Sequence, residues 1–263
     1  MPFNRLSTEK IAKAVGCHAN TVRLYEKIGF ISPVTRSPKG YRLYEDYHLD
    51  QMRLARLAME GVYPGPNIRA ALVDVVKQAA AQEWTDAVDL AYRCQSTVRL
   101  ERELAESAVA FLESWAKGKV DPVPGAPLQI RDVAKLLSLT TDVIRNWERS
   151  GLLTVPRSKT NRYRQYGAAE VGRVRVIRML RQAGYSPMAI LRMLIEYDKR
   201  AGQELLFARG SDLGHALRHA LDTPRADEDV ILAADRWLST LEEQENRAQQ
   251  VIDLLCAMQE RYS

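Results

Sequence analysis

The sequence predicts a mainly α-helical fold in which one small module occurs twice and two long amphipathic helices form much of the remainder. Three observations predict this fold. The chain matches itself when it is shifted by 122 residues, basic residues concentrate in the two matching segments, and apolar residues recur every three or four positions after each copy. With 263 residues, the chain is long enough for about two domains.

The repeat aligns Leu6–Leu72 with Leu128–Leu194 without a gap and contains 14 identical residues among 67 positions. Apolar character is also kept where Val22 aligns with Ile144 and Tyr25 with Trp147, as two copies of one core require. We therefore expect four segments: a first module (1–77), a long helix with a Pro-rich linker (78–127), a second module (128–198) and regulatory or dimerisation helices (199–263).

Each copy begins with a short helix, a tight break and a second helix that ends at a glycine, Gly29 or Gly151. A stretch with Pro, Arg, Gly or Asn follows and predicts two short strands around a turn. The expected helices are Thr8–Val15, Ala19–Ile28, Asp46–Glu60 and Pro66–Lys77 in the first copy, and Ile130–Leu137, Thr141–Ser150, Ala168–Ala183 and Pro187–Tyr197 in the second. Each module is thus a helix-turn-helix with a β-hairpin wing.

The charge distribution indicates two surfaces for a polyanion. The net charge is only +5, but residues 1–72 carry +5, residues 128–194 carry +9 and the rest of the chain carries −9. A chance excess of arginine is the alternative. Neither a long apolar run nor a secretion signal is present, so we expect a cytoplasmic protein without a membrane partner.

Catalytic and cofactor sites are not predicted. The sequence lacks a phosphate-binding loop, a nucleophile elbow and the spacing of a metal hydrolase, so we expect neither an enzyme nor a bound cofactor. Its three cysteines, Cys17, Cys94 and Cys256, stand far apart without a C-x-x-C pair. Neither a disulfide framework nor a zinc ribbon is indicated.

The run G-C-H-A-N-T-V-R-L-Y-E-K-I-G-F-I (Gly16–Ile31), followed by G-Y-R-L-Y (Gly40–Tyr44), resembles the signature of the MerR family of bacterial transcription regulators. The second copy keeps R-N-W-E-R-S-G-L-L (Arg145–Leu153) and R-Y-R-Q-Y (Arg162–Tyr166), a looser match. The departures from the family pattern are Leu24 and Asn146 at its first aromatic position, Trp147 at its second, and Arg162 at its wing glycine. The resemblance implies two winged helix-turn-helix modules that bind double-stranded promoter DNA on a bacterial nucleoid.

In such a module, the start of the second helix meets base edges in the major groove, while nearby cationic and hydroxyl groups hold phosphates. By position, the base-edge candidates are His18, Asn20 and Thr21 in the first copy, and Thr140, Thr141 and Asp142 in the second. Arg23 and Tyr25 are expected at the DNA backbone, and Arg145 and Trp147 are their counterparts. Helix capping is an equal alternative for His18 and Thr140.

The resemblance further implies that wing residues brace phosphates beside the groove, namely Tyr41, Arg42, Tyr44, Tyr163, Arg164 and Tyr166. Added charge is expected at the wing tips from Arg36, Lys39, Arg157, Lys159 and Arg162, and on the third helices from Arg53, Arg56, Arg175 and Arg178. Packing in the hairpin is the alternative for the tyrosines, and a solvated face is the alternative for the third-helix arginines. Glu26 and Glu148 are expected to pair with an arginine, because a carboxylate would repel phosphate.

Two segments carry the heptad spacing of long amphipathic helices. The first seam consists of Trp84, Ala87, Ala91, Cys94, Val98, Glu101, Ala105, Ala108, Leu112 and Trp115, and the second of Val230, Ala234, Trp237, Leu241, Gln244, Ala248, Val251, Leu255, Met258 and Tyr262. In the MerR family such a helix pairs antiparallel with that of a second subunit. We therefore expect either a monomer whose two helices pair within the chain, centred on Glu101 and Gln244, or a homodimer.

The segment Ala201–Thr223 has no counterpart after the first module and is a candidate element for a small-molecule effector. Asp212, His215 and His219 have metal-ligand spacing, but an exposed histidine pair explains them better. The family's mechanism implies that promoter distortion acts indirectly on RNA polymerase. The alternative function is a drug- or ligand-sequestering protein with little DNA binding, which would not need two basic modules.

Overall fold

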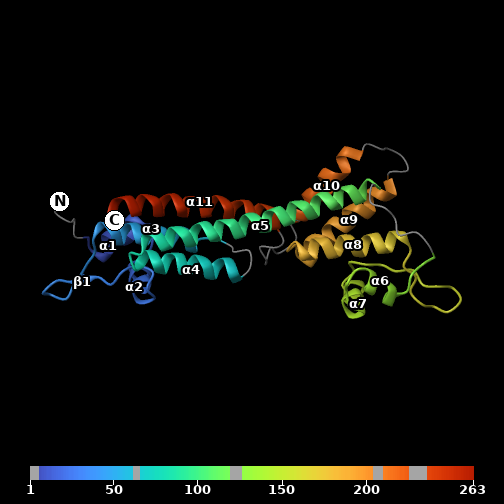
Figure 1. The fold of residues 1–263 in the computed structure, drawn as a ribbon, viewed down its shortest axis with the longest axis horizontal. Helices are drawn as coiled ribbons and strands as arrows, with labels where there is room; N and C mark the ends of the chain where they lie inside the picture. The colour runs from blue at the N-terminus through green and yellow to red at the C-terminus, as the bar shows by residue number, and fades with distance from the viewer. Residues whose placement is uncertain (1–5, 62–65, 119–125, 204–209, 225–235) are drawn as a thin grey trace. The chain divides into compact units, whose positions relative to one another are not determined.

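The structure, a computed structural model, describes residues 6–61, 66–118, 126–203, 210–224 and 236–263 (Figure 1). The chain divides into two compact units, Met1–Leu100 with Thr240–Ser263, and Glu101–Ser239. Across the described ranges, eleven helices and one two-stranded sheet confirm the mainly α-helical prediction. None of these helices is both long and apolar enough to cross a membrane. Val230 and Ala234 of the second seam, and residues 204–209, lie outside the described residues.

The first module consists of four helices and a two-stranded antiparallel wing. Its elements are α1 (Thr8–Ala14), α2 (Ala19–Lys27), β1 (Thr35–Arg36), β2 (Arg42–Leu43), α3 (Asp46–Met59) and α4 (Pro66–Ala80). The break between α1 and α2 falls at Gly16, whose φ of 65° is a conformation that favours glycine. Gly29, with a φ of 77°, follows the end of α2 as the sequence predicts.

The second module repeats this order of helices. Its elements are α6 (Ile130–Leu136), α7 (Thr141–Arg149), α8 (Ala168–Gln182) and α9 (Pro187–Gln203), after which comes α10 (Gly210–Asp222). Gly151 follows the end of α7 with a φ of 79°. Between α6 and α7, however, Ser138 takes the left-handed conformation, at a φ of 50°, that Gly16 takes in the first module. The turn is therefore kept although its best-suited residue is not.

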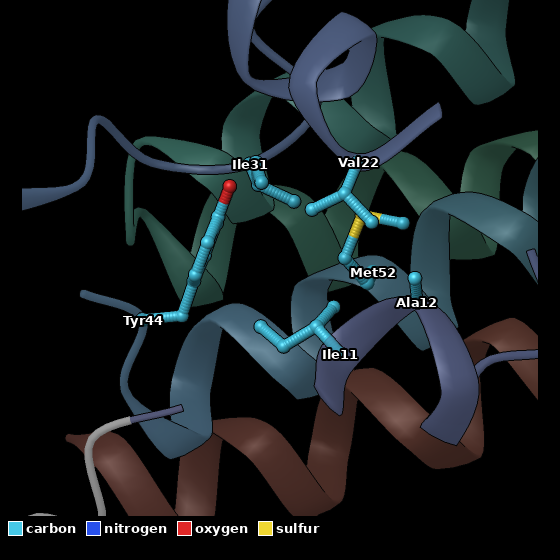
Figure 2. Packing of buried hydrophobic residues seen from close by; sticks show 6 residues of the cluster. All are labelled: Ile11, Ala12, Val22, Ile31, Tyr44 and Met52. Carbon is cyan, nitrogen blue, oxygen red and sulfur yellow. The ribbon is translucent and has the colours of Figure 1, made fainter. Parts of the chain in front are cut away.

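A cluster of buried side chains joins the helices of the first module to its wing. The cluster contains Ile11, Ala12, Val22, Ile31, Tyr44 and Met52 (Figure 2). Tyr44 is anchored to it by two backbone hydrogen bonds with Leu6, of 2.8 and 3.0 Å. Tyr166 makes the same pair of bonds with Leu128 in the second module, at 2.9 and 3.0 Å. The aligned residues of the second module are also buried, namely Val133, Ala134, Ile144, Leu153, Tyr166 and Val174, so both modules have a core of their own. Burial of each large apolar side chain contributes about 1.5–3 kcal/mol.

The two wings differ in loop length. Arg36 pairs with Arg42 in the first wing, whereas Arg157 forms an isolated bridge with Arg164 in the second. An ungapped repeat would have placed Ser158 at the position of Arg36, so the second loop is one residue longer and the preceding strand one residue shorter. The extra loop residue shifts the pairing, and the hairpin expected in the second wing is reduced to this bridge.

The long helices are α5 (Trp84–Ala116) and α11 (Trp237–Tyr262), and each contributes to both units. In the first unit the end of α11 runs antiparallel to the beginning of α5, because Gln95 donates to Gln249 at 2.8 Å and Gln259 donates to Thr85 at 3.0 Å. This register differs by one residue from the expected one. The buried seam residues of this unit are Trp84, Ala87, Ala91, Cys94, Val98, Leu241, Gln244, Ala248, Val251, Leu255 and Met258.

In the second unit the end of α5 packs on the second module. The ring centroids of Trp115 and Tyr197 of α9 lie 4.4 Å apart. Trp115 also packs against Gly172 of α8, where an added Cβ would lie only 2.6 Å from the indole Nε1. Glu113 also pairs with Arg218 of α10 at 3.3 Å. The first unit thus includes most of α11, which follows the second module in the sequence. The second unit includes the end of α5, which follows the first module.

Candidate nucleic-acid interface

The second helix of each module, α2 and α7, begins with a side chain that caps it. His18 Nδ1 accepts a hydrogen bond from the Asn20 amide at 3.2 Å, and Thr140 Oγ1 accepts one from the Val143 amide at 3.2 Å. Capping, the alternative weighed for both residues, is therefore present. Both caps remain exposed at the helix start, where a major-groove contact would be made.

An arginine one turn into each of these helices is held by its own helix. Arg23 Nη1 donates to Asn20 Oδ1 at 2.9 Å, and Arg145 Nη1 donates to Asp142 Oδ1 at the same distance. These are equivalent positions of the repeat, but the acceptor is neutral in the first module and charged in the second. At the start of α2 the guanidinium is therefore bonded to a neutral group, whereas at the start of α7 it forms an exposed ion pair.

The predicted contact residues fall into three groups by burial. The exposed ones are His18, Asn20, Arg23, Arg36, Lys39, Tyr41, Arg53, Thr140, Asp142, Arg145, Arg157, Lys159, Arg162 and Tyr163. The partly buried ones are Thr21, Tyr25, Arg42, Arg56, Thr141, Arg164, Arg175 and Arg178. The buried ones are Tyr44, Trp147 and Tyr166. More than half of the set is thus accessible to a ligand as large as DNA.

An exposed tyrosine stands at the tip of each wing. Tyr41 is 72% exposed and Tyr163 is 66% exposed, so neither is a packing residue of its module. Each follows a residue in the left-handed region, Gly40 with a φ of 82° and Arg162 with a φ of 60°. Both loops therefore present a phenol to solvent at the same place, where its hydroxyl is free to meet a phosphate.

A salt bridge fixes each wing to the helix in front of it. Arg42 Nε donates to Glu26 Oε2 at 2.6 Å, and Arg164 Nε donates to Glu148 Oε2 at 2.6 Å. This confirms the expected pairing of both glutamates with an arginine. Hydrogen bonding to Glu26 raises the pKa of Arg42, and hydrogen bonding to Glu148 does the same for Arg164. Wing and helix are thereby held in one orientation in both modules.

Tyr44 and Tyr166 are 0% and 1% exposed, and burial raises the pKa of both phenols. Their side chains belong to the cores, which favours the packing alternative. Trp147 is 8% exposed and also packs inside its module. Its counterpart Tyr25 is only partly buried and lies edge-on to Phe30, with ring centroids 5.3 Å apart. The same helix position is therefore mainly structural in one module and half accessible in the other.

The third-helix arginines are not equivalent in the two modules. Arg53 Nη1 pairs with Asp50 Oδ1 at 2.9 Å and half of its side chain is exposed. Arg56 lies near Tyr25, where its charge opposes the rise in the pKa of that phenol that burial causes. Arg175 and Arg178 of α8 are both partly buried. Arg53 is thus the one exposed residue of these four arginines, and it is paired with a carboxylate.

Known families match both modules. Residues 7–44 match the family described as "MerR family regulatory protein", and residues 128–196 match the family described as "MerR HTH family regulatory protein". Each module thus resembles the MerR family, over 38 residues in the first module and 69 residues in the second. The first match spans α1 to the end of the wing, and the second reaches from Leu128, just before α6, into α9.

The chain is also similar to curated MerR-type regulators. It is 37% identical over 55 residues to the HTH-type transcriptional regulator CueR of Escherichia coli O157:H7, covering 21% of this chain and 41% of that protein. It is 34% identical over 80 residues to a probable heavy metal-dependent transcriptional regulator of Haemophilus influenzae, covering 30% and 62%. The chain thus spans less than two thirds of these relatives. No solved structure matches it.

One polar residue of the first MerR module, Asp50 on α3, was given no role by the sequence. It is 5% exposed, and besides Arg53 its carboxylate accepts hydrogen bonds from Arg261 at 3.0 Å and from the Tyr262 hydroxyl at 2.8 Å. The second module has Gly172 at this position, the residue that receives Trp115. Because the bonds from Arg261 and Tyr262 join residues more than 200 positions apart, no local pattern indicates them.

Proposed function

We propose that this chain is a MerR-type transcription regulator that binds double-stranded promoter DNA through both modules, one on each half of an imperfect palindrome. The observation that carries the proposal is the repeated exposure of an arginine on the second helix, Arg23 or Arg145, together with a tyrosine at the wing tip, Tyr41 or Tyr163. A cation and a phenol at matching sites are suited to phosphate contacts, and the capped helix starts are suited to base edges.

We further propose that the chain acts as an intrachain pseudo-dimer, in which α5 and α11 replace the two paired helices of separate subunits. The antiparallel hydrogen bonds Gln95–Gln249 and Thr85–Gln259 support this. Binding of both modules would bend and untwist a promoter between its half-sites and thereby act on RNA polymerase indirectly. A small-molecule effector would shift the balance between the bent and unbent states.

The test begins with selection of bound fragments from genomic DNA by the full chain, which supplies a site for quantitative binding. Arg23→Ala is expected to weaken binding across sequences and to reduce the slope of log affinity against log salt by about one. Arg145→Ala is expected to have a smaller effect on the slope, because Asp142 already compensates that charge. Arg93→Ala, on the exposed side of α5, is the matched control for the loss of one positive charge.

Unchanged affinity and slope with Arg23→Ala would refute DNA binding through α2. A selected site with a single half and no symmetry would show that only one module reads sequence. Light scattering separately tests the pseudo-dimer. A mass near 29.8 kDa on the DNA-free chain is expected, whereas twice that mass would favour a homodimer with four modules.

A further inference from the structure

A cavity of about 500 Å³ lies in the second unit between α9 and α10. Arg192, Glu196 and Arg200 of α9 line one side, and His215 and His219 of α10 line the other, together with small residues of α10. Sites for small molecules typically measure about 300–1,000 Å³ and combine apolar walls with a few polar groups. The cavity thus has the size of a metabolite site and is far too small for DNA.

The first module has no helix at the place of α10, because only residues 81–83 separate α4 from α5 in the described range 66–118. Helix α10 is the added element, and contacts at several points along it hold it in place. Arg192 Nε donates to the Ala220 carbonyl at 3.2 Å, and Arg218 pairs with Glu113 of α5 at 3.3 Å. At the end of α10, Asp222 accepts from the Ser239 amide at 3.3 Å. The two walls of the cavity are therefore held by bonds that do not depend on a ligand.

The charges that line the cavity favour an anion. Arg192 is only 4% exposed, and a guanidinium is rarely buried to that extent without a structural or binding role. Glu196 Oε1 accepts from Arg200 Nε at 2.6 Å, which orients the second guanidinium. Among the described residues that line the cavity, one bears a carboxylate and four bear guanidinium or imidazole groups, which can donate hydrogen bonds to an anion. Guanidinium groups match the planar oxygen pairs of carboxylates and phosphates.

We propose that this cavity binds a small organic molecule through a carboxylate or phosphate group, held by Arg192 and Arg200 with His215 and His219 beside it. This goes beyond DNA binding and does not depend on it, because the cavity belongs to α9 and α10 and contains none of the exposed arginines and tyrosines assigned to DNA. Helix α10 also touches α5 through Glu113, so a bound anion lies next to the long helix that completes the second module.

The chain's four histidines make a direct test possible. His215 and His219 line the cavity, His18 caps α2 and His48 is buried in the first module. Histidine-labelled, DNA-free full chain would be titrated with citrate and, separately, with inorganic pyrophosphate while the imidazole resonances are followed by NMR. We expect saturable shifts of His215 and His219 with at least one probe, and none of His48. Citrate alone would indicate a carboxylate ligand, and pyrophosphate alone a phosphate ligand.

Two variants and a control complete the test. Arg200→Gln is expected to weaken probe binding by at least about tenfold, since a hydrogen bond to a charged group is lost. Lys199→Gln, on an exposed neighbour outside the cavity, is the matched control and should leave binding unchanged. Ala216→Phe keeps every charge but fills the cavity, and it should abolish the shifts. The proposal is overturned if neither probe shifts His215 and His219, if His18 alone responds, or if all three variants bind alike.

Discussion

The two modules share their internal bonds and differ in what surrounds them. In both, a glutamate of the second helix holds a wing arginine at 2.6 Å, Glu26 with Arg42 and Glu148 with Arg164. The modules differ where the third helix meets a long helix. Asp50 accepts a hydrogen bond from Tyr262 of α11 in the first unit, whereas Gly172 packs against Trp115 of α5 in the second. The copies have therefore kept the contacts that orient wing and helix and changed those that receive a long helix.

This difference shows which constraints act on a duplicated module. The wing contact has the same geometry in both copies, and the same pair of residue types makes it at 2.6 Å in each. The long helices are not copies of one another in detail, and one module binds a Tyr262 hydroxyl where the other accommodates an indole ring. A carboxylate suits the first partner and the absence of a side chain suits the second.

The largest expected effect concerns the second helices, where Trp147 is core and Tyr25 is only half-buried. Trp147→Ala should destabilise the second unit by about 3–5 kcal/mol, because it leaves a large cavity. Tyr25→Ala should destabilise the first unit by about half as much, since less apolar area is lost. Hydrogen exchange resolved by peptide measures both units at once. Equal losses would contradict the difference in burial between these positions.

A second, smaller effect concerns the contact of α11 with the first module. Asp50→Ala removes the acceptor of Arg53, Arg261 and the Tyr262 hydroxyl, and should destabilise the first unit by about 2 kcal/mol. Urea unfolding gives the free energy, and exchange at the last turn of α11 locates the change. Asp74→Ala, on an exposed site of α4, is the control and should stay within about 0.5 kcal/mol. If the last turn of α11 stays protected from hydrogen exchange in Asp50→Ala, the Asp50 carboxylate does not hold that turn in place.

Local patterns were sufficient to predict the helix-turn-helix units. Gly29 and Gly151 bound the second helices, and the seam spacing predicted the buried side of both long helices, from Trp84 to Val98 and from Leu241 to Met258. The Glu26–Arg42 pair was partly predictable, because a carboxylate near phosphate needs a compensating cation. In each case the signal lies in residue type and spacing within one copy.

Other features depend on contacts or loop lengths that residue types do not encode. An ungapped repeat cannot reveal that Arg157, rather than Ser158, is the counterpart of Arg36, because a longer loop and a shorter strand cancel in the alignment. The cavity beside α10 depends on how Arg192 meets the Ala220 carbonyl, a packing outcome. The choice between phosphate contact and packing for Tyr44 was open for the same reason, since a tyrosine suits both a core and a surface.

A third effect is a pH dependence specific to the first module. His48 is 1% exposed and its Nδ1 accepts from the Glu45 amide at 3.0 Å; burial, the largest influence, lowers its pKa. The unfolded chain, with a histidine pKa of about 6.5, then binds more protons than the folded one. Stability should be complete above this value and fall as the pH is lowered through it.

The second module has Glu170 at the position of His48, where it bonds the Gly167 amide at 2.9 Å. His48→Gln keeps an acceptor for the capping bond but cannot titrate. The measurement is the difference in urea stability between pH 7.5 and pH 5.5, which should shrink in this variant. If the stability difference between the two pH values were the same in the variant and the natural chain, His48 would not be its cause.

The smallest effect compares the wing tips, Gly40 with a φ of 82° and Arg162 with a φ of 60°. Gly40→Ala should destabilise by about 1 kcal/mol, purely through backbone strain, because a Cβ there meets no atom within 4 Å. Arg162→Gly should stabilise by only about 0.5 kcal/mol, since relief of strain is offset by the entropy of glycine in the unfolded chain. Urea midpoints measure both changes. If Arg162→Gly instead lowers stability, the arginine side chain contributes to folding more than its backbone strain costs, and the second wing is not simply a weaker copy of the first.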